Sequence, residues 1–219
     1  CVYESGDQGA IDMWANPLYR GNIIRWNLFD RIINRSGDHL GAAAVRHDDY
    51  ISGYMVYENI FRKGGKGAFG AVQFNKGTDN YVEGNIFIDW PKVFSGRSAH
   101  GPEWKRKITS HSNSKRVLNE TDWKSETWRK KYPMVRDLFN GDDNHNYLAD
   151  NQRFGSSAWG GVGRSIWFNN QSKDKHFHGD SLEAIKSVLV PWHSIPVDWI
   201  GPYDAESILK MIEKVPKSK

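Results

Sequence analysis

A pair of asparagines five residues apart recurs along the chain, and this spacing constrains the fold more than any other feature. The two asparagines enclose two apolar and two variable residues in segments 22–27, 80–85 and 146–151, and a relaxed copy spans 54–59. In the first three copies along the chain a phenylalanine follows two positions after the second asparagine, at Phe29, Phe61 and Phe87. A pattern of this kind is typical of repeat architectures, in which each repeat packs on its neighbours.

A short strand that begins with glycine or alanine precedes each of these three copies, at 9–13, 43–47 and 70–74. The unit is strand, turn, strand, asparagine turn and strand, with a length of about 26–34 residues. Asparagine tolerates left-handed backbone angles, so we expect it to turn the chain, and stacked asparagine amides form a hydrogen-bonded ladder. We therefore predict an all-β chain in which residues 1–94 form coils of a right-handed parallel β-helix, a solenoid. The alternative is a sandwich of antiparallel hairpins, which the lack of hairpin turns between the strands disfavours.

The remaining residues divide into three parts. Residues 95–145 are polar and predict an insertion with short helices, one of which spans about 125–132 and is ended by Pro133. Residues 146–179 return to the repeat pattern and predict the last coil or coils. Residues 180–219 begin with a capping box and predict C-terminal helices that cover the edge of the solenoid. A hydrophobic fraction of 38 % with 21 Gly and 10 Trp suits such a turn-rich β body.

Composition and charge exclude several kinds of site. Cys1 is the only cysteine, so neither an internal disulfide nor a cysteine-based metal site can form. No apolar stretch approaches the roughly 20 residues of a membrane span, and the first residues lack the regions of a signal peptide. The net charge is +4, with cations gathered at 105–107 and 129–131, but no nucleic-acid motif accompanies them. We expect the C-terminal portion of a longer, secreted or periplasmic monomer without a nucleic-acid partner.

Acidic residues concentrate at the edges of the Gly/Ala-led strands, in segments 4–12 and 46–49. Equivalent positions on stacked parallel strands lie about 4.8 Å apart. Aligning residues 10, 44 and 71 predicts two rows on the outer face, which consist of Asp12, Arg46 and Gln73, and of Trp14, Asp48 and Asn75. The expected result is an outward polar patch of two acids, a base, two amides and an indole.

Such a patch suits a sugar substrate. Trp14 would stack on a sugar ring, and carboxylates on neighbouring coils would flank the scissile bond, as glycoside hydrolysis requires. Crowded like charges raise the pKa of one carboxyl group, which produces a general acid. The alternative is that these aspartates only form turns and end the polar rows. A calcium site at His47, Asp48 and Asp49 is a further option without a spaced oxygen-ligand loop, and other histidines, among them His111, are scattered.

Several segments carry a resemblance to a known family. They are 6–12, 19–22, 46–53, 69–74 and 79–87, with 128–133 and 195–201 matching the later part of such chains. They resemble bacterial right-handed parallel β-helix proteins, most of all glycoside hydrolase family 141, which has fucosidase and xylanase members. The resemblance implies a catalytic pair of aspartates on adjacent coils, which match Asp7 and either Asp48 or Asp49. Arg46 and His47 stand where an apolar residue is expected, so the aspartate that points outward is left open.

We therefore predict a polysaccharide-active glycoside hydrolase with three candidate catalytic residues, Asp7, Asp48 and Asp49. The candidate substrate-binding residues are Glu4, Gln8, Asp12, Trp14, Arg46, His47, Gln73 and Lys76. Two alternatives stand beside this prediction. One is a polysaccharide lyase in which Arg46 or Lys76 abstracts a proton beside a uronic acid, and the other is a non-catalytic glycan-binding β-helix. No cofactor is predicted other than the calcium option.

Overall fold

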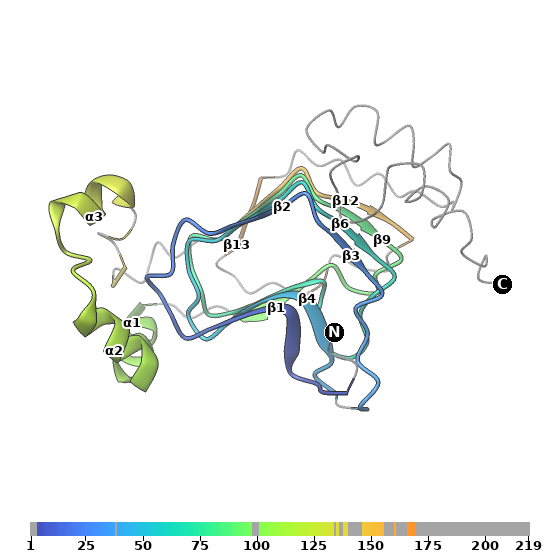
Figure 1. The fold of residues 1–219 in the computed structure, drawn as a ribbon, viewed down its shortest axis with the longest axis horizontal. Helices are drawn as coiled ribbons and strands as arrows, with labels where there is room; N and C mark the ends of the chain where they lie inside the picture. The colour runs from blue at the N-terminus through green and yellow to red at the C-terminus, as the bar shows by residue number, and fades with distance from the viewer. Residues whose placement is uncertain are drawn as a thin grey trace.

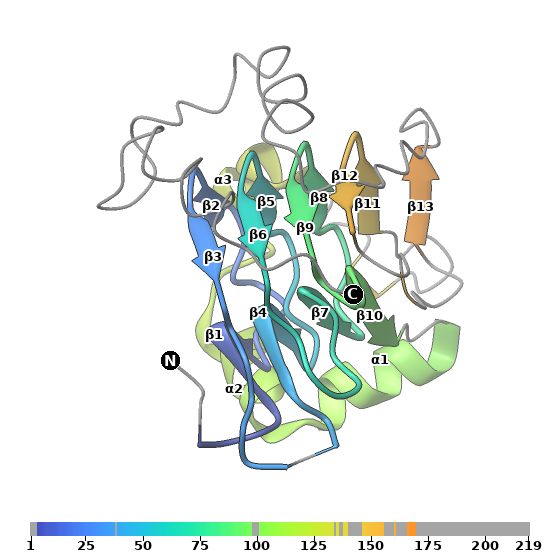
Figure 2. The ribbon, with the colours of Figure 1, turned by 90° about the vertical axis from the view of Figure 1, so that its right-hand side faces the viewer.

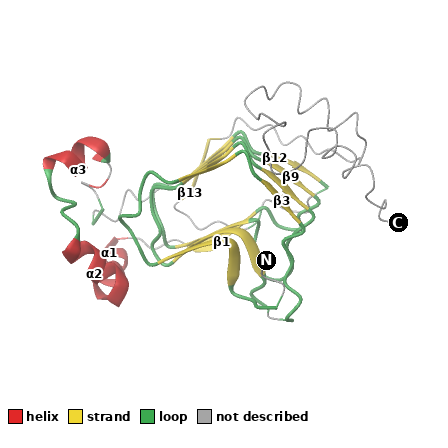
Figure 3. Ribbon diagram, in the orientation of Figure 1, coloured by secondary structure: helices red, strands yellow, loops and turns green. Residues whose placement is uncertain are grey.

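Short parallel strands dominate the computed structural model, which describes residues 4–37, 39–97, 101–133, 135, 138–139, 146–155, 160 and 166–169. The protein is mostly β, with few helices, and its strands belong to three sheets (Figures 1 and 3). Every strand pairing within these residues is parallel. A sandwich of antiparallel hairpins, the alternative from the sequence, is therefore excluded for this part of the chain.

Successive strands are placed in the three sheets in rotation. The first sheet contains β1 (Gln8–Trp14), β4 (Ala42–Asp48), β7 (Val72–Asn75) and β10 (Phe94–Arg97). The second contains β2 (Ile23–Arg25), β5 (Met55–Tyr57), β8 (Tyr81–Glu83), β11 (Asn146–Ala149) and β13 (Ile166–Asn169). The third contains β3 (Leu28–Asp30), β6 (Ile60–Arg62), β9 (Ile86–Ile88) and β12 (Gln152–Phe154). We call β1–β3, β4–β6, β7–β9 and β10–β12 repeats 1 to 4, and Figure 2 shows them side by side in chain order.

The predicted asparagine ladder is confirmed. The side-chain amide of Asn27 donates to the Oδ1 atom of Asn59 at 3.0 Å, and Asn59 donates in the same way to Asn85 at 3.0 Å. Asn85 then donates to Asn151 at 2.9 Å. Each acceptor oxygen also receives the backbone N–H of the preceding asparagine, so every step of the ladder carries two hydrogen bonds.

The residue that turns the backbone at this corner is not the asparagine, and that part of the prediction was wrong. The left-handed angle belongs to the residue before it, with φ values of 58° at Trp26, 55° at Glu58, 64° at Gly84 and 50° at Asp150. A residue at φ > 0 swings the chain to a new direction, and the asparagine that follows satisfies the backbone groups the turn leaves free. Asparagine therefore holds the corner through its amide rather than through its own backbone.

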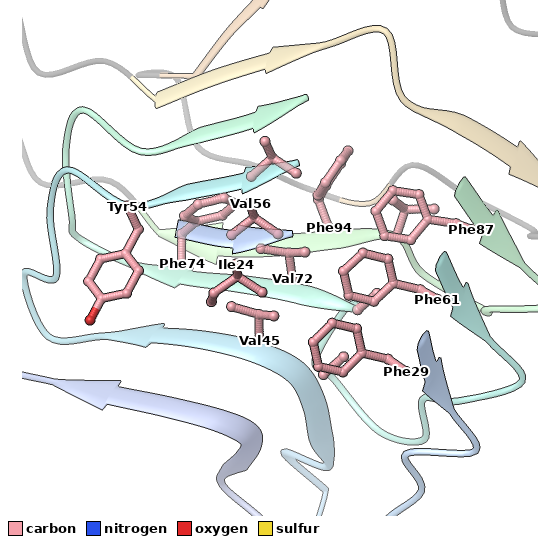
Figure 4. Close-up of a cluster of buried hydrophobic side chains, with 14 of the residues drawn as sticks. Ile24, Phe29, Val45, Tyr54, Val56, Phe61, Val72, Phe74, Phe87 and Phe94 are labelled. Carbon is pink, nitrogen blue, oxygen red and sulfur yellow. The ribbon is translucent and has the colours of Figure 1, made fainter. Parts of the chain in front are cut away.

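The interior between the sheets is filled by columns of apolar side chains (Figure 4). Phe29, Phe61 and Phe87 form a stacked column in which ring centroids are 4.8 and 4.7 Å apart. The next position in the same register is Arg153, which ends the column after three rings. Parallel register repeats each side chain above its equivalent, so burial of one repeat depends on its neighbours.

Helices occur between β10 and β11, within the predicted insertion. They are α1 (Gly101–Ser110), α2 (Ser112–Glu120) and α3 (Glu126–Lys131). The helix predicted before Pro133 is α3, whose first turn is capped by the Ser125 side chain, whereas α1 and α2 were not individually predicted. Trp104 and Ile108 of α1 pack with Leu18 and Tyr50, so this segment covers one end of the first sheet.

Two sequence predictions lie outside the described residues. The helices predicted over 180–219 fall there entirely, and of the predicted 146–179 segment only 146–155, 160 and 166–169 are described. Among the helices that the structure describes, none has the length and apolar character to span a membrane.

Candidate active site on the outer face of the first sheet

The register of the first sheet is the one predicted from the sequence. Asp12 pairs with Arg46, which pairs with Gln73, and Trp14 pairs with Asp48. These positions share the outer face of β1, β4 and β7, so the predicted polar rows are confirmed as neighbours. Asn75 extends the second row, because its amide donates to Asp48 across the strands at 2.8 Å.

Arg46 links the carboxylates of this face. Its guanidinium is 2.8 Å from Asp7 Oδ1, 3.2 Å from Asp12 Oδ2 and 2.6 Å from Asp48 Oδ2. The Arg46 side chain is only 10 % exposed, so these contacts are made in a partly desolvated setting where charge-assisted hydrogen bonds are strong. Arg46 thus holds three acids in fixed positions and balances part of their charge.

Asp48 and Asp49 point to the same place although they are consecutive residues. In an extended strand adjacent side chains point to opposite faces. Here Asp49 has φ of 37°, at the corner that follows β4, and this turns its carboxylate back toward Asp48. The amide nitrogen of Asn75 donates to Asp48 Oδ1 at 2.8 Å and to Asp49 Oδ1 at 3.0 Å. The two oxygens are therefore at most 5.8 Å apart, the sum of those two distances.

The surroundings of Asp49 are rich in donors and cations. Its carboxylate accepts a hydrogen bond from the Trp14 indole at 3.1 Å and lies 3.7 Å from the Lys76 ammonium. His111 Nε2, from the segment between α1 and α2, is also 3.7 Å from this carboxylate. The His111 ring packs edge-on against Trp14 and Tyr50, at centroid distances of 5.2 and 5.6 Å.

The electrostatic setting of Asp48 differs from that of Asp49. Burial raises the pKa of Asp48 above its ordinary value, and the Asp49 and Asp7 charges act in the same direction. The Asn75 hydrogen bond and the Arg46 charge oppose this rise, but desolvation is the larger effect. A carboxyl group with a raised pKa retains its proton at higher pH, which is the property a general acid needs.

His47 does not belong to this face, which corrects its assignment as a substrate-binding residue. Strand alternation directs its side chain to the interior side of β4, where it is fully buried. Its ring packs against Tyr54 and Phe74 at ring-centroid distances of 5.3 and 5.2 Å. Burial lowers the pKa of His47 to about 3, so the imidazole is neutral at ordinary pH. The neutral His47 ring therefore occupies the inward position, between Val45 and Asp48, where an apolar residue was expected. Asp48 is the aspartate of β4 whose side chain points outward.

The other predicted residues lie at different depths. Trp14 is 52 % exposed, and Asp7 is the most exposed of the acids that contact Arg46. Gln73 is buried in the Arg46 row, and its Oε1 atom has no hydrogen-bond partner within the described residues. Gln8, the first residue of β1, and Glu4, four residues before it, are exposed, and within the described residues neither side chain bonds to the aspartates.

Two residues of this cluster were missing from the predicted site. Asn75 was placed in the patch by its register but was not assigned a role, although its amide joins Asp48 and Asp49. His111 is more than sixty positions from Asp49 along the chain, and no local pattern marks the tertiary contact that brings them together.

The calcium option receives no geometric support from this cluster. Among the residues that the structure describes, no three His, Cys, Asp or Glu side chains are grouped for metal binding. The Asp48 carboxylate is 2.6 Å from the Arg46 guanidinium and the Asp49 carboxylate is 3.7 Å from the Lys76 ammonium, so both are already paired with cations that would repel a calcium ion.

Comparisons of the chain with protein-family models, with curated proteins and with solved structures found no significant match.

Proposed function

We propose that the three parallel sheets are the faces of a right-handed parallel β-helix, in which each repeat is one coil. The rotation of successive strands through the sheets supports this arrangement, as do the asparagine ladder and the stacked phenylalanines. In such a solenoid, strand ends from neighbouring coils present their side chains in rows on one outer face. The candidate site would then be a feature of the coil stack, without a separate catalytic loop.

We further propose that the protein is a glycoside hydrolase that acts on a polysaccharide through Asp48 and Asp49. The observation that carries this proposal is the pair of carboxylates held on one Asn75 amide in contrasting environments. Asp48 is desolvated, with a raised pKa, whereas Asp49 faces the Trp14 indole, Lys76 and His111. Paired groups whose environments diverge are the usual basis of an acid and a nucleophile.

The separation of the two groups disfavours an inverting reaction and so supports a retaining one. Asp48 Oδ1 and Asp49 Oδ1, the oxygens that bond to Asn75, are at most 5.8 Å apart, and this upper limit is below the roughly 6.5–9.5 Å of inverting enzymes. Asp48 would protonate the glycosidic oxygen while Asp49 attacks the anomeric carbon, forming a glycosyl ester and releasing the leaving sugar. Asp48 would then deprotonate a water molecule that hydrolyses the ester and restores both carboxyl groups.

The charge of this surface suits a neutral sugar substrate better than an acidic one. Four acids, Asp7, Asp12, Asp48 and Asp49, surround two bases, Arg46 and Lys76, so the patch carries a net negative charge. A uronic acid would be repelled, and Arg46 already contacts three carboxylates. The lyase alternative therefore has less support than hydrolysis. The exposed Trp14 indole offers a flat apolar surface on which a neutral sugar ring can stack.

The experiment is a product assay on a panel of neutral and uronic-acid polysaccharides. We expect new reducing ends without the ultraviolet absorbance of an unsaturated product. Asp48→Asn should lower turnover by about 10²–10⁴-fold, the contribution typical of a general acid. Asp49→Gly should abolish turnover, and added azide should restore release of the leaving sugar by attacking in place of the missing carboxylate. Glycine suits the left-handed angle of this position, so the backbone should be undisturbed.

Asp150→Asn is the matched control, because Asp150, like Asp49, is an aspartate at a left-handed corner, with φ of 50°, and it is exposed. It should leave turnover unchanged. Full activity in both Asp48→Asn and Asp49→Gly would refute the assignment of the pair. An unsaturated product would favour the lyase, and retention of a glycan without any product would favour a binding protein.

A further inference from the structure

The positive charge of the chain is concentrated in its helical segment. Residues 101–131 contain nine Lys or Arg and four Asp or Glu, a net charge of +5, whereas the whole chain carries +4. The remaining residues are thus close to neutral, and the candidate site on the first sheet is locally acidic. The two surfaces differ in the sign of the ligand charge that they attract.

This cationic segment contains a cavity of about 440 Å³, a size typical of small-ligand sites. Its lining includes Thr109, Lys115, Asn119, Trp123, Lys124 and Phe139. Trp123 packs edge-on against Phe139 at a centroid distance of 5.5 Å, and its indole N–H donates to the Leu118 carbonyl at 3.1 Å. Trp123 is 8 % exposed and its N–H is already bonded, so what it offers a ligand is the part of its ring that lines the cavity and not a donor.

Two lysines line the cavity together with the Trp123 and Phe139 rings, which form its aromatic wall. Lys124 lies over the Trp123 ring, with Nζ 5.2 Å from the ring centroid, and Lys115 lines the same cavity from α2. Both side chains are exposed, and neither has an ion-pair partner among the described residues. Asp122 is the one acid among the lining residues, so cations outnumber acids there.

We propose that this cavity is a second, non-catalytic site that binds an acidic oligosaccharide. An aromatic wall packs on the apolar face of a sugar ring, hydroxyl and amide side chains such as Thr121 and Asn119 bond to sugar hydroxyls, and Lys115 and Lys124 pair with a carboxylate. A neutral sugar would use only the first two contacts. A nucleic acid would need a longer basic track than one cavity with two lysines.

The position of the cavity connects it to the face described above. Thr109 lines the cavity, and two residues later His111 contacts Trp14 and Asp49. A glycan that carries uronic acids among neutral sugars could therefore be retained at the cavity while its neutral part lies on the first sheet. The binding itself does not depend on hydrolysis at Asp48 and Asp49.

The test is titration of the full chain with a short oligogalacturonate and, as comparator, a neutral xylo-oligosaccharide of equal length. Binding is followed by calorimetry and by tryptophan fluorescence. We expect saturable binding of the acidic probe that weakens about tenfold in the Lys115→Gln/Lys124→Gln variant, as loss of two exposed ion pairs implies. The control is Lys105→Gln/Lys130→Gln, which removes the same charge from exposed lysines that do not line the cavity.

Three outcomes would overturn the proposal. They are the absence of saturable binding, an equal loss in the cavity and control variants, and equal competition by inorganic phosphate or a short RNA, which would indicate a general cationic surface. Asp49→Gly should bind the acidic probe as the unchanged protein does. Retained binding in that variant separates failure of the proposed hydrolysis from failure of this site.

Discussion

Replacing His47 by phenylalanine is expected to make the stability of the protein less dependent on pH. His47 is fully buried, and neither of its ring nitrogens has a hydrogen-bond partner within the described residues. In register it lies between Met13 and Phe74, so a phenylalanine continues an apolar row. The substitution removes a titratable group from the core without placing a new polar atom there.

The magnitude follows from the pKa of this imidazole. Burial lowers the pKa of His47 from 6.5 to about 3, so at pH 5 the folded ring is neutral while the unfolded chain binds a proton. Stability rises with pH wherever the unfolded state holds more protons, so folding loses free energy as the pH falls below 6.5. At 1.36 kcal/mol per pH unit, the loss at pH 5 is about 2 kcal/mol.

The assay is urea unfolding of the original protein, His47→Phe and His47→Leu at pH 7.5 and pH 5. The original protein should lose about 2 kcal/mol more than either variant between these two conditions. The raised pKa of Asp48 acts in the opposite direction, and it is present in all three proteins, so it largely cancels in the comparison. Phenylalanine and leucine differ in packing, so their absolute stabilities will differ while their pH dependences agree. An unchanged pH dependence in both variants would refute the reasoning.

Two further substitutions test the polar contacts of the fold. Arg46→Met should destabilise the protein by about 3–5 kcal/mol at pH 7.5, because it leaves the buried Asp48 carboxylate without its cation; Arg129→Met on the exposed face of α3 should cost less than about 0.5 kcal/mol in the same unfolding assay. Asn85→Ala should cost about 2–4 kcal/mol, because its amide bonds to Val56, Glu83 and Asn151 and accepts from Asn59. Asn22→Ala loses one recorded hydrogen bond, to Tyr19, and an equal loss in both variants would contradict a special role of the ladder.

The parallel register could be predicted because the sequence repeats its chemistry at the positions that stack. Asn27, Asn59 and Asn85 recur at the same corner of each unit, and aligning them aligns the strands of the second and third sheets. The first sheet has different intervals between its strands, so its outer rows followed from a separate alignment of the Gly/Ala-led strands at residues 10, 44 and 71, together with alternation. These features depend on the equivalence of repeats, which is visible in the sequence.

The corner residues could not be predicted in the same way. Trp26, Glu58 and Asp150 share a left-handed angle but no side-chain chemistry, because the angle is imposed by stacking rather than by local preference. The convergence of Asp48 and Asp49 depends on such an angle, so the pair could be named but not oriented. His47 was misplaced for a related reason: a histidine between charged residues resembles a surface position, although alternation turns it inward.

The asparagine ladder also explains where the chain tolerates additional sequence. Its successive members are 32, 26 and 66 positions apart, yet the amide contacts between them are nearly the same length. The longest interval contains α1, α2 and α3. Each amide contact of the ladder depends on the backbone at its own corner and not on the length of chain between two corners. A segment inserted between two ladder asparagines therefore leaves the alignment of the sheets intact. The length of the helical segment can therefore vary while the ladder keeps its register, whereas Trp104, Ile108 and His111 are tied to the first sheet by their contacts with Leu18, Tyr50 and Asp49.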